Sequence, residues 1–417
     1  MVQSLYVILL VIMSKITLSE ELKWRGFVNQ TTLGDLTVLD GEKWIFYHGY
    51  DASVDSLTIG NLAAIMLDKC FLRHGHKAIL LAGGATSLIG DPGGKDAERP
   101  LQSEEEVTKN VRAVKAQLEQ LFGSRVHLLN NLDWFKKMNV LEFLRDVGKH
   151  FSMTPLVQRD YIATRMGKEG SGISYTELSY TLLQGYDFLH LYKNYGVELQ
   201  LAGSDQWGNS LSGVELVRRV ENKEVHALTM PLIINKITGK KFGKTEGGAV
   251  WLDPKKTSPD EFYQFWVNMD DQGVGNYLKI FTELDKDKIN QVMTDFEKDM
   301  PSRLAQKTLA YEVTKLVHGK DAAEQAKENA EALKVHVSDH LNVSETVAVD
   351  TSIVDTLLSS GLVSSKTEAR QLLSSGGVYI NDKQTTKTNF EAADFTDGLL
   401  KLRRGKTLKN TVILKLK

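Results

Sequence analysis

The fold is decided by a stretch that reads YHGYDASVDSLTIGNL and occupies residues 47–62. Before it, residues 44–47 are aromatic and β-branched, which is typical of a short buried strand. After it, apolar residues recur at helical spacing over residues 62–70, and Gly75 marks a stop. Residues 76–82 are again apolar, so the segment predicts a βαβ unit. In such sheets, ligands bind at the carboxyl ends of the strands.

The beginning of the expected helix is the first candidate site. Gly60 permits a close approach of the backbone to a ligand, and helix N-termini attract phosphate groups. A plain strand-to-helix turn capped by Ser56 or Thr58 is the alternative interpretation. The residues of this segment alone leave both interpretations open.

Length and charge limit the class of protein. The 417 residues predict two or three domains, and a content of 42% hydrophobic and 25% charged residues is ordinary for a globular protein. The net charge of −2 is uneven, because residues 351–417 hold 11 Lys and Arg against 6 Asp and Glu, which gives +5 there and −7 elsewhere. A basic lobe on an acidic body predicts a polyanionic partner for that lobe.

The single cysteine and the N-terminus bear on the compartment. Cys70 alone excludes an internal disulfide bond and indicates a reducing compartment, so we expect a cytoplasmic protein. The apolar run over residues 5–13 is shorter than the ~20 residues of a membrane span and lacks the features of a signal peptide. We therefore expect no membrane partner and interpret residues 1–12 as an N-terminal extension. The sequence contains no cluster of Cys and His residues that would predict a metal site.

Polar side chains gather in two further segments. A glycine-rich loop after the second expected strand holds Asp91 in a Pro-Gly turn; its spacing is not that of a P-loop, and a flexible turn is the alternative. In the helix expected over residues 175–191, Tyr180, Gln184 and Asp187 lie at i, i+4 and i+7, on one stripe. A solvated face is the alternative, but the neighbouring aromatic residues favour a pocket.

Two loops complete the candidate site. Asp205 follows the strand expected over residues 197–202, and a simple helix N-cap is the alternative interpretation. The loop of residues 235–250 contains four lysines and several glycines. Such a loop is suited to binding anions, and a solvated hairpin is the alternative.

The order of the predicted domains follows from changes in pattern along the chain. Residues 13–250 predict an α/β domain with a parallel sheet, and residues 251–331 predict helices separated by short breaks. Residues 332–350 are polar and weakly patterned, which predicts a linker. Residues 351–417 read as two short helices and basic strands, which predicts a small α+β domain.

Five motifs occur in order along the chain: D-S-L-x-I-G-x-L at 55–62, GDP at 90–92, Y-x-x-x-Q-x-x-D at 180–187, GSDQWGN at 203–209 and KFGKT at 241–245. Together they resemble the bacterial-type tyrosyl-tRNA synthetases, which are class I enzymes. The resemblance implies a Rossmann-like catalytic domain and a helical anticodon-binding domain. It also implies a tyrosine–tRNA ligase, which activates tyrosine with ATP and then transfers it to tRNA-Tyr.

The C-terminal region carries two more motifs, S-K-x-E-A-R-Q-L at 365–372 and G-x-V-Y-I-N at 376–381. They resemble the S4-type RNA-binding domain that ends these enzymes. The resemblance and the basic charge together imply RNA-binding residues, which we expect to be Lys366, Arg370, Arg403, Arg404 and Lys406.

The same resemblance implies a role for each candidate site residue. Phenol recognition is implied for Tyr47 and Asp187, because a site that hydrogen-bonds the hydroxyl rejects phenylalanine by ~10⁴–10⁵. The implied tyrosine-binding residues are Tyr47, Asp91, Tyr180, Gln184, Asp187 and Gln206. The implied ATP-binding residues are Gly49, Asp51, Gly60, Asp205 and Lys244. The residues implied to stabilise the departing pyrophosphate are Ser53, Thr58, Asn61, Lys95, Arg99, Lys241, Lys244 and Thr245.

The chain departs from the family at Thr58 and Asn61, where the family has histidines. A hydroxyl and an amide are also hydrogen-bond donors, so we expect an active enzyme. Two alternatives remain: a catalytically weak synthetase-like RNA-binding factor, and a synthetase for a related amino acid such as tryptophan, against which Tyr47 and Asp187 argue. The resemblance further implies ATP as a substrate with Mg²⁺, no tightly bound cofactor, and a homodimer.

Overall fold

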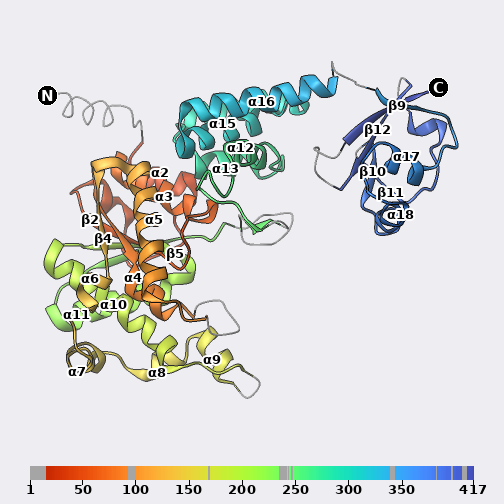
Figure 1. Ribbon diagram of the computed structural model, residues 1–417. Helices are drawn as coiled ribbons and strands as arrows, with labels where there is room; N and C mark the ends of the chain where they lie inside the picture. Colours follow the sequence, from red (N-terminus) through yellow and green to blue (C-terminus); the bar gives the residue numbers. More distant parts are fainter. Residues whose placement is uncertain are drawn as a thin grey trace. The chain divides into compact units, whose positions relative to one another are not determined.

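The computed structural model describes residues 16–92, 100–167, 170–233, 242, 244–245, 248–338, 343–381, 383–395, 398–405 and 411–417. The chain divides into two compact units, the first ending at Lys327 and the second beginning at Glu328. Figure 1 shows the elements of both units. In the described part of the chain, no helix is long and apolar enough to cross a membrane.

A six-stranded sheet lies at the centre of the first unit (Figure 1). The predicted parallel α/β sheet is confirmed: neighbouring strands run parallel except at the β1 edge. Because the chain moves outward from β2 through β3 to β4 and then returns to β5 beside β2, a topological switch point lies between β2 and β5. The spatial order is β1 (Gln30–Thr31), β6 (His226–Met230), β5 (Leu199–Gly203), β2 (Ile45–Asp51), β3 (Lys77–Gly83) and β4 (Val126–Asn130).

The helices beside the sheet begin and end where the sequence indicates. Thr58 is the N-cap of α3 (Ile59–Arg73), and Gly75 adopts φ +88° just beyond its end, a conformation that favours glycine. Ser103 caps α5, and Gly196 ends α10 in the left-handed conformation. The other long helices of this region are α5 (Glu104–Phe122), α10 (Tyr175–Tyr195) and α11 (Trp207–Glu221).

Shorter elements connect these helices and strands. The segment between β4 and α10 consists of brief helical turns rather than one long helix. The short elements of the first unit are η1 (Leu36–Asp40), α4 (Gly84–Ile89), η2 (Gly123–Arg125), α6 (Leu132–Phe135), α7 (Val140–Glu142), η3 (Phe143–Val147), η4 (Gly148–His150), α8 (Met153–Val157), α9 (Asp160–Met166), η5 (Ser204–Gln206), β7 (Lys244–Thr245), β8 (Gly248–Ala249) and η6 (Met300–Ser302).

The predicted helices after residue 251 belong to the same compact unit as the sheet. They are α12 (Pro259–Val267), α13 (Val274–Phe281), α14 (Lys286–Lys298) and α15 (Leu304–His318). The N-terminal helix α2 (Leu18–Arg25) packs against α3 and α13. Its Arg25 guanidinium donates hydrogen bonds to the carbonyl oxygens of Thr282 and Leu284, each at 2.9 Å.

The second unit contains a five-stranded sheet in the order β11-β10-β12-β13-β9. The range 332–350, for which a linker is predicted, contains the end of α16 and all of β9, which pairs in parallel with β13. A strand of five residues is too short for its pattern to stand out in a polar stretch. The elements are α16 (Lys320–Ser338), which reaches it from the first unit, β9 (Val343–Val347), α17 (Ile353–Ser359), α18 (Lys366–Ser374), β10 (Val378–Ile380), β11 (Lys383–Thr385), η7 (Ala392–Asp394), β12 (Leu399–Arg404) and β13 (Thr411–Leu416).

Candidate active site

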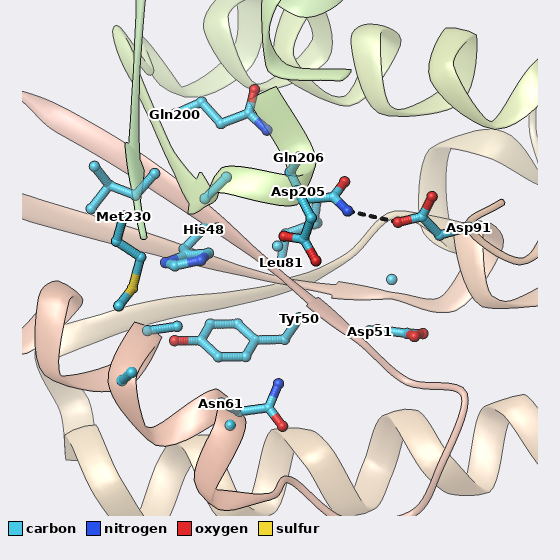
Figure 2. Close-up of a pocket in the computed structure, with 18 of the residues that line it drawn as sticks. His48, Tyr50, Asp51, Asn61, Leu81, Asp91, Gln200, Asp205, Gln206 and Met230 are labelled. Carbon is cyan, nitrogen blue, oxygen red and sulfur yellow. Dashed lines mark hydrogen bonds between the residues drawn. The ribbon is translucent and has the colours of Figure 1, made fainter. Parts of the chain in front are cut away.

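A cavity of about 390 Å³ opens at the carboxyl ends of β2 and β5. It lies at the switch point of the sheet, where open α/β sheets bind ligands. Figure 2 shows side chains from β2, from α3 and from the segment after β5 around it. The predicted site residues that line it are Tyr47, Gly49, Asp51, Thr58, Gly60, Asn61, Asp91, Tyr180, Gln184, Asp187, Asp205 and Gln206.

Alternation of side chains along β2 divides this cavity into two sides. Tyr47 points toward α10, where its ring lies 5.2 Å from that of Phe188, centroid to centroid. The next residue, His48, points to the opposite face, where its Nδ1 lies 2.7 Å from Asp68 Oδ1 of α3. We call the two parts the α10 side and the α3 side. Between them, a Cβ added at Gly49 would meet no atom within 4 Å, so the backbone here is open to a ligand.

On the α10 side, the Asp187 carboxylate is buried and held by two donors. Asn131 Nδ2 donates to Oδ2 and Trp134 Nε1 donates to Oδ1, each at 3.0 Å. Burial raises the pKa of Asp187 to about 7, because desolvation outweighs the two hydrogen bonds that favour the carboxylate. Burial, with the Asp187 charge, raises the pKa of Tyr47 well above its usual value, so this phenol stays protonated.

Three polar atoms on the α10 side have no hydrogen-bond partner within the described residues. They are Tyr47 Oη, Gln184 Oε1 and Gln200 Oε1, all buried. Gln200 lies directly opposite Tyr47 in the β2–β5 register, so both side chains face the same way. An unsatisfied buried polar group costs ~1–3 kcal/mol. This concentration of unsatisfied atoms therefore indicates a polar ligand for the α10 side.

Asp91 and Gln206 are held together at the rim of the cavity. Gln206 Nε2 donates to Asp91 Oδ2 at 2.6 Å, which Figure 2 shows as a dashed line. Gln206 Oε1 in turn accepts from Asn209 Nδ2 at 3.0 Å. Arg159 donates to Asn209 Oδ1 at 3.0 Å and fixes this chain from behind. A carboxylate and an amide are thus oriented before any ligand binds.

On the α3 side, Thr58 and Asn61 form a capping box. The Thr58 hydroxyl and the Thr58 backbone N–H both donate to Asn61 Oδ1, at 3.1 and 3.0 Å. Thr58 Oγ1 also accepts from the Gly60 backbone N–H at 3.3 Å. The proton of the Thr58 hydroxyl is therefore already used within the helix cap, whereas the Asn61 amide points into the cavity (Figure 2).

Asp51, at the end of β2, is braced by two serines. Ser53 Oγ donates to Asp51 Oδ1 at 2.6 Å, and Ser87 Oγ donates to the same oxygen at 2.9 Å. Ser53 itself is not among the residues that line the cavity. The structure therefore places this predicted residue next to Asp51 but outside the cavity lining.

Within and after the KFGKT segment, the described residues are held by contacts with the rest of the first unit. Phe242 lines the cavity and packs among the rings of α12 and α13, 5.2 Å from Phe281 and 5.0 Å from Tyr277. After the segment, Trp251 forms an isolated antiparallel β-bridge with Thr58. The Ile59 backbone N–H donates to the carbonyl oxygen of Val250. The predicted residues Lys95, Arg99 and Lys241, and the side chains of Lys244 and Thr245, lie outside the described residues.

Sequence reasoning missed Asn131 and Gln200 in the cavity and Trp134 behind it. Asn131 and Trp134 donate to Asp187, and Gln200 lies beside Tyr47 on the neighbouring strand, but none of the three belongs to a motif. The rule that identifies the carboxyl ends of parallel strands points to Asn131, which follows β4. His48 and Tyr50 follow the strand predicted over residues 44–47, and the sequence predicts no role for them; the structure extends that strand through both of them.

The predicted RNA-binding residues lie on α18 and β12 of the second unit. Arg370 is exposed on α18, and Lys366 forms an ion pair of 2.7 Å with Asp355. Arg403 stacks over the Tyr379 ring. Arg404 is tied to the fold by an ion pair of 2.8 Å with Glu368 and a hydrogen bond to a backbone carbonyl. Lys406 lies outside the described residues.

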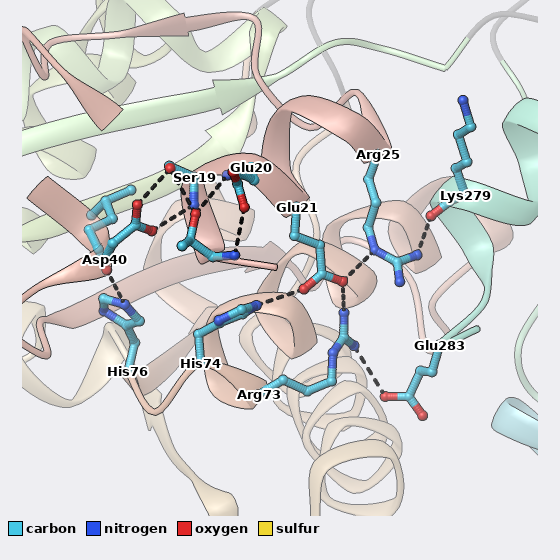
Figure 3. A network of polar contacts seen from close by, with 12 residues as sticks. Ser19, Glu20, Glu21, Arg25, Asp40, Arg73, His74, His76, Lys279 and Glu283 are labelled. Carbon is cyan, nitrogen blue, oxygen red and sulfur yellow. Dashed lines mark hydrogen bonds and ion pairs between the residues drawn. The ribbon is translucent and has the colours of Figure 1, made fainter. Parts of the chain in front are cut away.

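The described residues contain one group with the spacing of metal ligands, formed by Glu21, Cys70 and His74. Its carboxylate is already occupied: Arg25 and Arg73 lie 2.6 Å from Glu21 and His74 lies 2.7 Å from it (Figure 3). Burial acts against them, yet these three side chains hold the pKa of Glu21 well below its usual range. Burial, with the Glu21 charge, raises the pKa of Cys70 to about 12. The group is an ion-pair network that joins α2 to α3.

Two known protein families match this chain. Residues 39–334 match the family "tRNA synthetases class I (W and Y)", and residues 333–412 match the family "Tyrosine--tRNA ligase SYY-like C-terminal domain". The tyrosine–tRNA ligase of Roseiflexus castenholzii is 43% identical over 415 residues, which cover 94% of this chain and 97% of that protein. The chain belongs to the class I tyrosyl-tRNA synthetases.

Other tyrosyl-tRNA synthetases are also similar to this chain. The tyrosine–tRNA ligase of Lactococcus lactis subsp. cremoris is 42% identical and is covered over 99% of its length, with 94% of this chain. A solved structure of a C-terminally truncated mitochondrial tyrosyl-tRNA synthetase from Aspergillus nidulans is 31% identical, with a TM-score of 0.69. It covers 76% of this chain and 94% of its own. The predicted family and fold class are thereby confirmed.

Proposed function

We propose that this synthetase activates L-tyrosine with ATP and transfers the tyrosyl group to tRNA-Tyr. A carboxylate oxygen of tyrosine attacks the α-phosphorus of ATP, tyrosyl-adenylate forms, and pyrophosphate leaves. A hydroxyl at the 3′ end of tRNA then displaces AMP. The observation that carries the proposal is the α10 side, where the unsatisfied Tyr47 hydroxyl and the buried Asp187 carboxylate line the same cavity.

Tyrosine fits this side because its phenol satisfies both groups. The hydroxyl of the substrate donates to Asp187 and accepts from Tyr47. Phenylalanine would leave both buried groups without a partner, and such stranding gives discrimination of ~10⁴–10⁵. Gln184 and Gln200 offer two more unsatisfied oxygens to the amino acid. Tyr180, Asp91 and Gln206 complete the amino-acid site as acceptors and donors for its ammonium and carboxylate groups.

ATP occupies the α3 side, toward the N-terminus of α3. The open backbone at Gly49 and the exposed Gly60 at the start of α3, with Asp51 and Asp205, support binding of the nucleotide. Lys244, with Ser53, Thr58, Asn61, Lys95, Arg99, Lys241 and Thr245, is proposed to stabilise the pyrophosphate as it leaves. No general base is required, so these residues act by positioning and by charge stabilisation. Mg²⁺ arrives bound to ATP as part of the substrate.

The second unit binds tRNA in this proposal. Its net charge of +5 over residues 351–417 and the exposed Arg370 support electrostatic binding of a polyanion. The S4-type character of the unit rests on the motifs at 365–372 and 376–381. With one buried cysteine and a tRNA partner, we place the enzyme in the cytoplasm.

A homodimer is part of the proposal. Large apolar side chains stay exposed over residues 140–175, and exposed apolar side chains in one region favour an interface. Leu141 is 74% exposed and Tyr175 is 68% exposed. The full set in this segment is Val140, Leu141, Leu144, Met153, Met166 and Tyr175.

Tyrosine-dependent exchange of pyrophosphate into ATP tests the proposed function. We expect exchange with tyrosine, and at least a thousandfold less with phenylalanine or tryptophan. Charging of tRNA-Tyr should follow the same order. Binding of tRNA without any exchange would contradict the proposal and favour a catalytically weak RNA-binding factor. Exchange with tryptophan would identify a different amino-acid substrate.

A further inference from the structure

His48, Tyr50 and Asp68 form a buried hydrogen-bond network on the α3 side, and none of the three is among the residues proposed to bind tyrosine or ATP. His48 Nδ1 lies 2.7 Å from Asp68 Oδ1, and the Tyr50 hydroxyl donates to Asp68 Oδ2 at 2.6 Å. Asp68 is fully buried. His48 and Tyr50 both line the cavity, and Figure 2 shows the two rings on the same side of β2. The three residues connect the wall of the nucleotide site to the interior of α3.

This network is costly for a purely structural element. A buried polar network with a carboxylate gives weak stabilisation, and apolar side chains of similar size are often as stable or more stable. The residues one turn before and after Asp68 on the buried face of α3, Ile65 and Phe71, are apolar. A carboxylate at this place therefore calls for a reason other than stability.

The network orients the imidazole toward the cavity. The Tyr50 hydroxyl donates to Asp68 Oδ2. The other carboxylate oxygen, Oδ1, accepts the Nδ1 proton of His48, and this sets the direction of the imidazole ring. Within the described residues, no hydrogen bond is formed by Nε2 of His48. That nitrogen is the atom of His48 left to meet a ligand.

The segment that bears the family's histidines offers less than its residue types suggest. The Thr58 hydroxyl donates to Asn61 within the capping box, so only the Asn61 amide remains as a side-chain donor there. Both His48 and Asn61 line the same cavity. The chain thus lacks imidazoles at the start of α3 but presents one from the adjacent strand.

We propose that His48, oriented by Asp68 and Tyr50, contacts the nucleotide as the adenylate forms and supplies the imidazole that is missing at positions 58 and 61. His48 is then a catalytic residue, whereas Asp68 and Tyr50 are positioning residues. The inference rests on the proposed function, because it concerns the ATP side of the same cavity. His48 transfers neither a proton nor an electron in this step. It contributes only a hydrogen bond to the nucleotide.

The test is pre-steady-state formation of tyrosyl-adenylate in the full-length enzyme. His48→Gln should lower the rate constant about tenfold to a hundredfold, near the low end for loss of one such donor, while tyrosine affinity changes less than about twofold. Asp68→Asn should lower the rate constant less and leave the KM for ATP unchanged. His74→Gln is the matched control, since His74 also lies 2.7 Å from a carboxylate, but outside the cavity.

A double-mutant cycle separates compensation from structure. In the background Thr58→His with Asn61→His, the loss caused by His48→Gln should shrink to less than about threefold, because the sites then share one task. An equal loss in both backgrounds, an unchanged rate for His48→Gln in the natural background, or an equal loss for His74→Gln would overturn the inference. Absence of exchange in the unmodified enzyme would instead refute the proposed function.

Discussion

The two sides of the cavity differ in how their polar groups are satisfied. On the α10 side, Tyr47, Gln184 and Gln200 keep buried polar atoms without partners in the described structure. On the α3 side, Thr58 and Asn61 bond to each other, and Tyr50 and His48 both bond to Asp68. Tyr47 and His48 are adjacent in β2, yet within the described residues the Tyr47 hydroxyl has no partner and the His48 imidazole bonds to Asp68.

We infer that, in the proposed function, this difference separates recognition of the amino acid from catalysis. A buried atom without a partner is satisfied only by the correct ligand, so the α10 side would gain binding energy from tyrosine in the ground state and the transition state alike. The preformed hydrogen bonds of the α3 side instead fix donors in place before charge develops on the phosphates, which costs no reorganisation during the reaction. Substitutions on the two sides should therefore change different kinetic constants.

The largest effect is expected at Asp187. Asp187→Asn keeps an oxygen for Asn131 or Trp134 but loses the charged acceptor for the substrate phenol, so kcat/KM for tyrosine should fall about a thousandfold or more. Pyrophosphate exchange measures this. The variant should also be more stable to unfolding above pH 7, because a buried carboxylate is removed. A tyrosine activity within tenfold of the natural enzyme would contradict the assignment of the α10 side.

A pH profile distinguishes the two sides with no substitution at all. The pKa of Asp187 is raised to about 7, so its carboxylate is lost as pH falls through that value. The KM for tyrosine should then rise about tenfold per pH unit below 7, while the KM for ATP stays flat. In the folded protein this group binds its proton more tightly than in the unfolded chain, so its contribution to stability decreases as pH rises from about 4 to about 7. Asp187→Asn should abolish both trends.

A substitution in the second unit should affect neither side. Arg370→Glu reverses an exposed charge on α18. We expect tRNA affinity to fall about tenfold, with a salt dependence whose slope is lower by about 1. Adenylate formation should be unchanged. Glu368→Gln on the same helix removes the ion-pair partner of Arg404 without removing a positive charge, so it should not lower tRNA affinity. An equal loss of pyrophosphate exchange would show that the unit takes part in activation.

The smallest effect is expected at Thr58. Because its hydroxyl already donates to Asn61, Thr58→Ala should lower the rate constant of adenylate formation only about threefold, well below the loss of a full transition-state donor. Loss of the cap should cost about 1 kcal/mol in the free energy of unfolding. Rapid kinetics and thermal denaturation measure the two effects. A loss of a hundredfold or more would mean that Thr58 leaves its cap to contact the phosphates.

Much of the fold followed from local patterns. The stop near Gly75 is reproduced, the strand predicted over residues 44–47 continues to Asp51, and of the two alternative caps, Ser56 and Thr58, the structure has Thr58. All three features are set by short-range chemistry. Strand β9 was missed because it is short and polar and becomes a strand only through pairing with β13, more than 60 residues away. Nonlocal pairing of this kind leaves no periodic trace in the sequence.

The site was predicted where its residues form motifs and missed where they act through neighbours. Tyr180, Gln184 and Asp187 share one helical stripe and all line the cavity. Asp68, by contrast, sits among apolar residues of α3, where periodicity predicts only a core position. Its partners, His48 and Tyr50, come from a strand that approaches it only in the folded chain.

The most direct test of the central claim is the preference for tyrosine over phenylalanine in Tyr47→Phe, measured as the ratio of kcat/KM values in pyrophosphate exchange. The substitution removes one buried hydroxyl that has no partner in the described structure and keeps the ring that packs on Phe188. We predict that the ratio falls about tenfold to a hundredfold, because activity toward tyrosine decreases while activity toward phenylalanine stays the same or rises. A ratio equal to that of the natural enzyme would show that the phenol is not recognised at the α10 side.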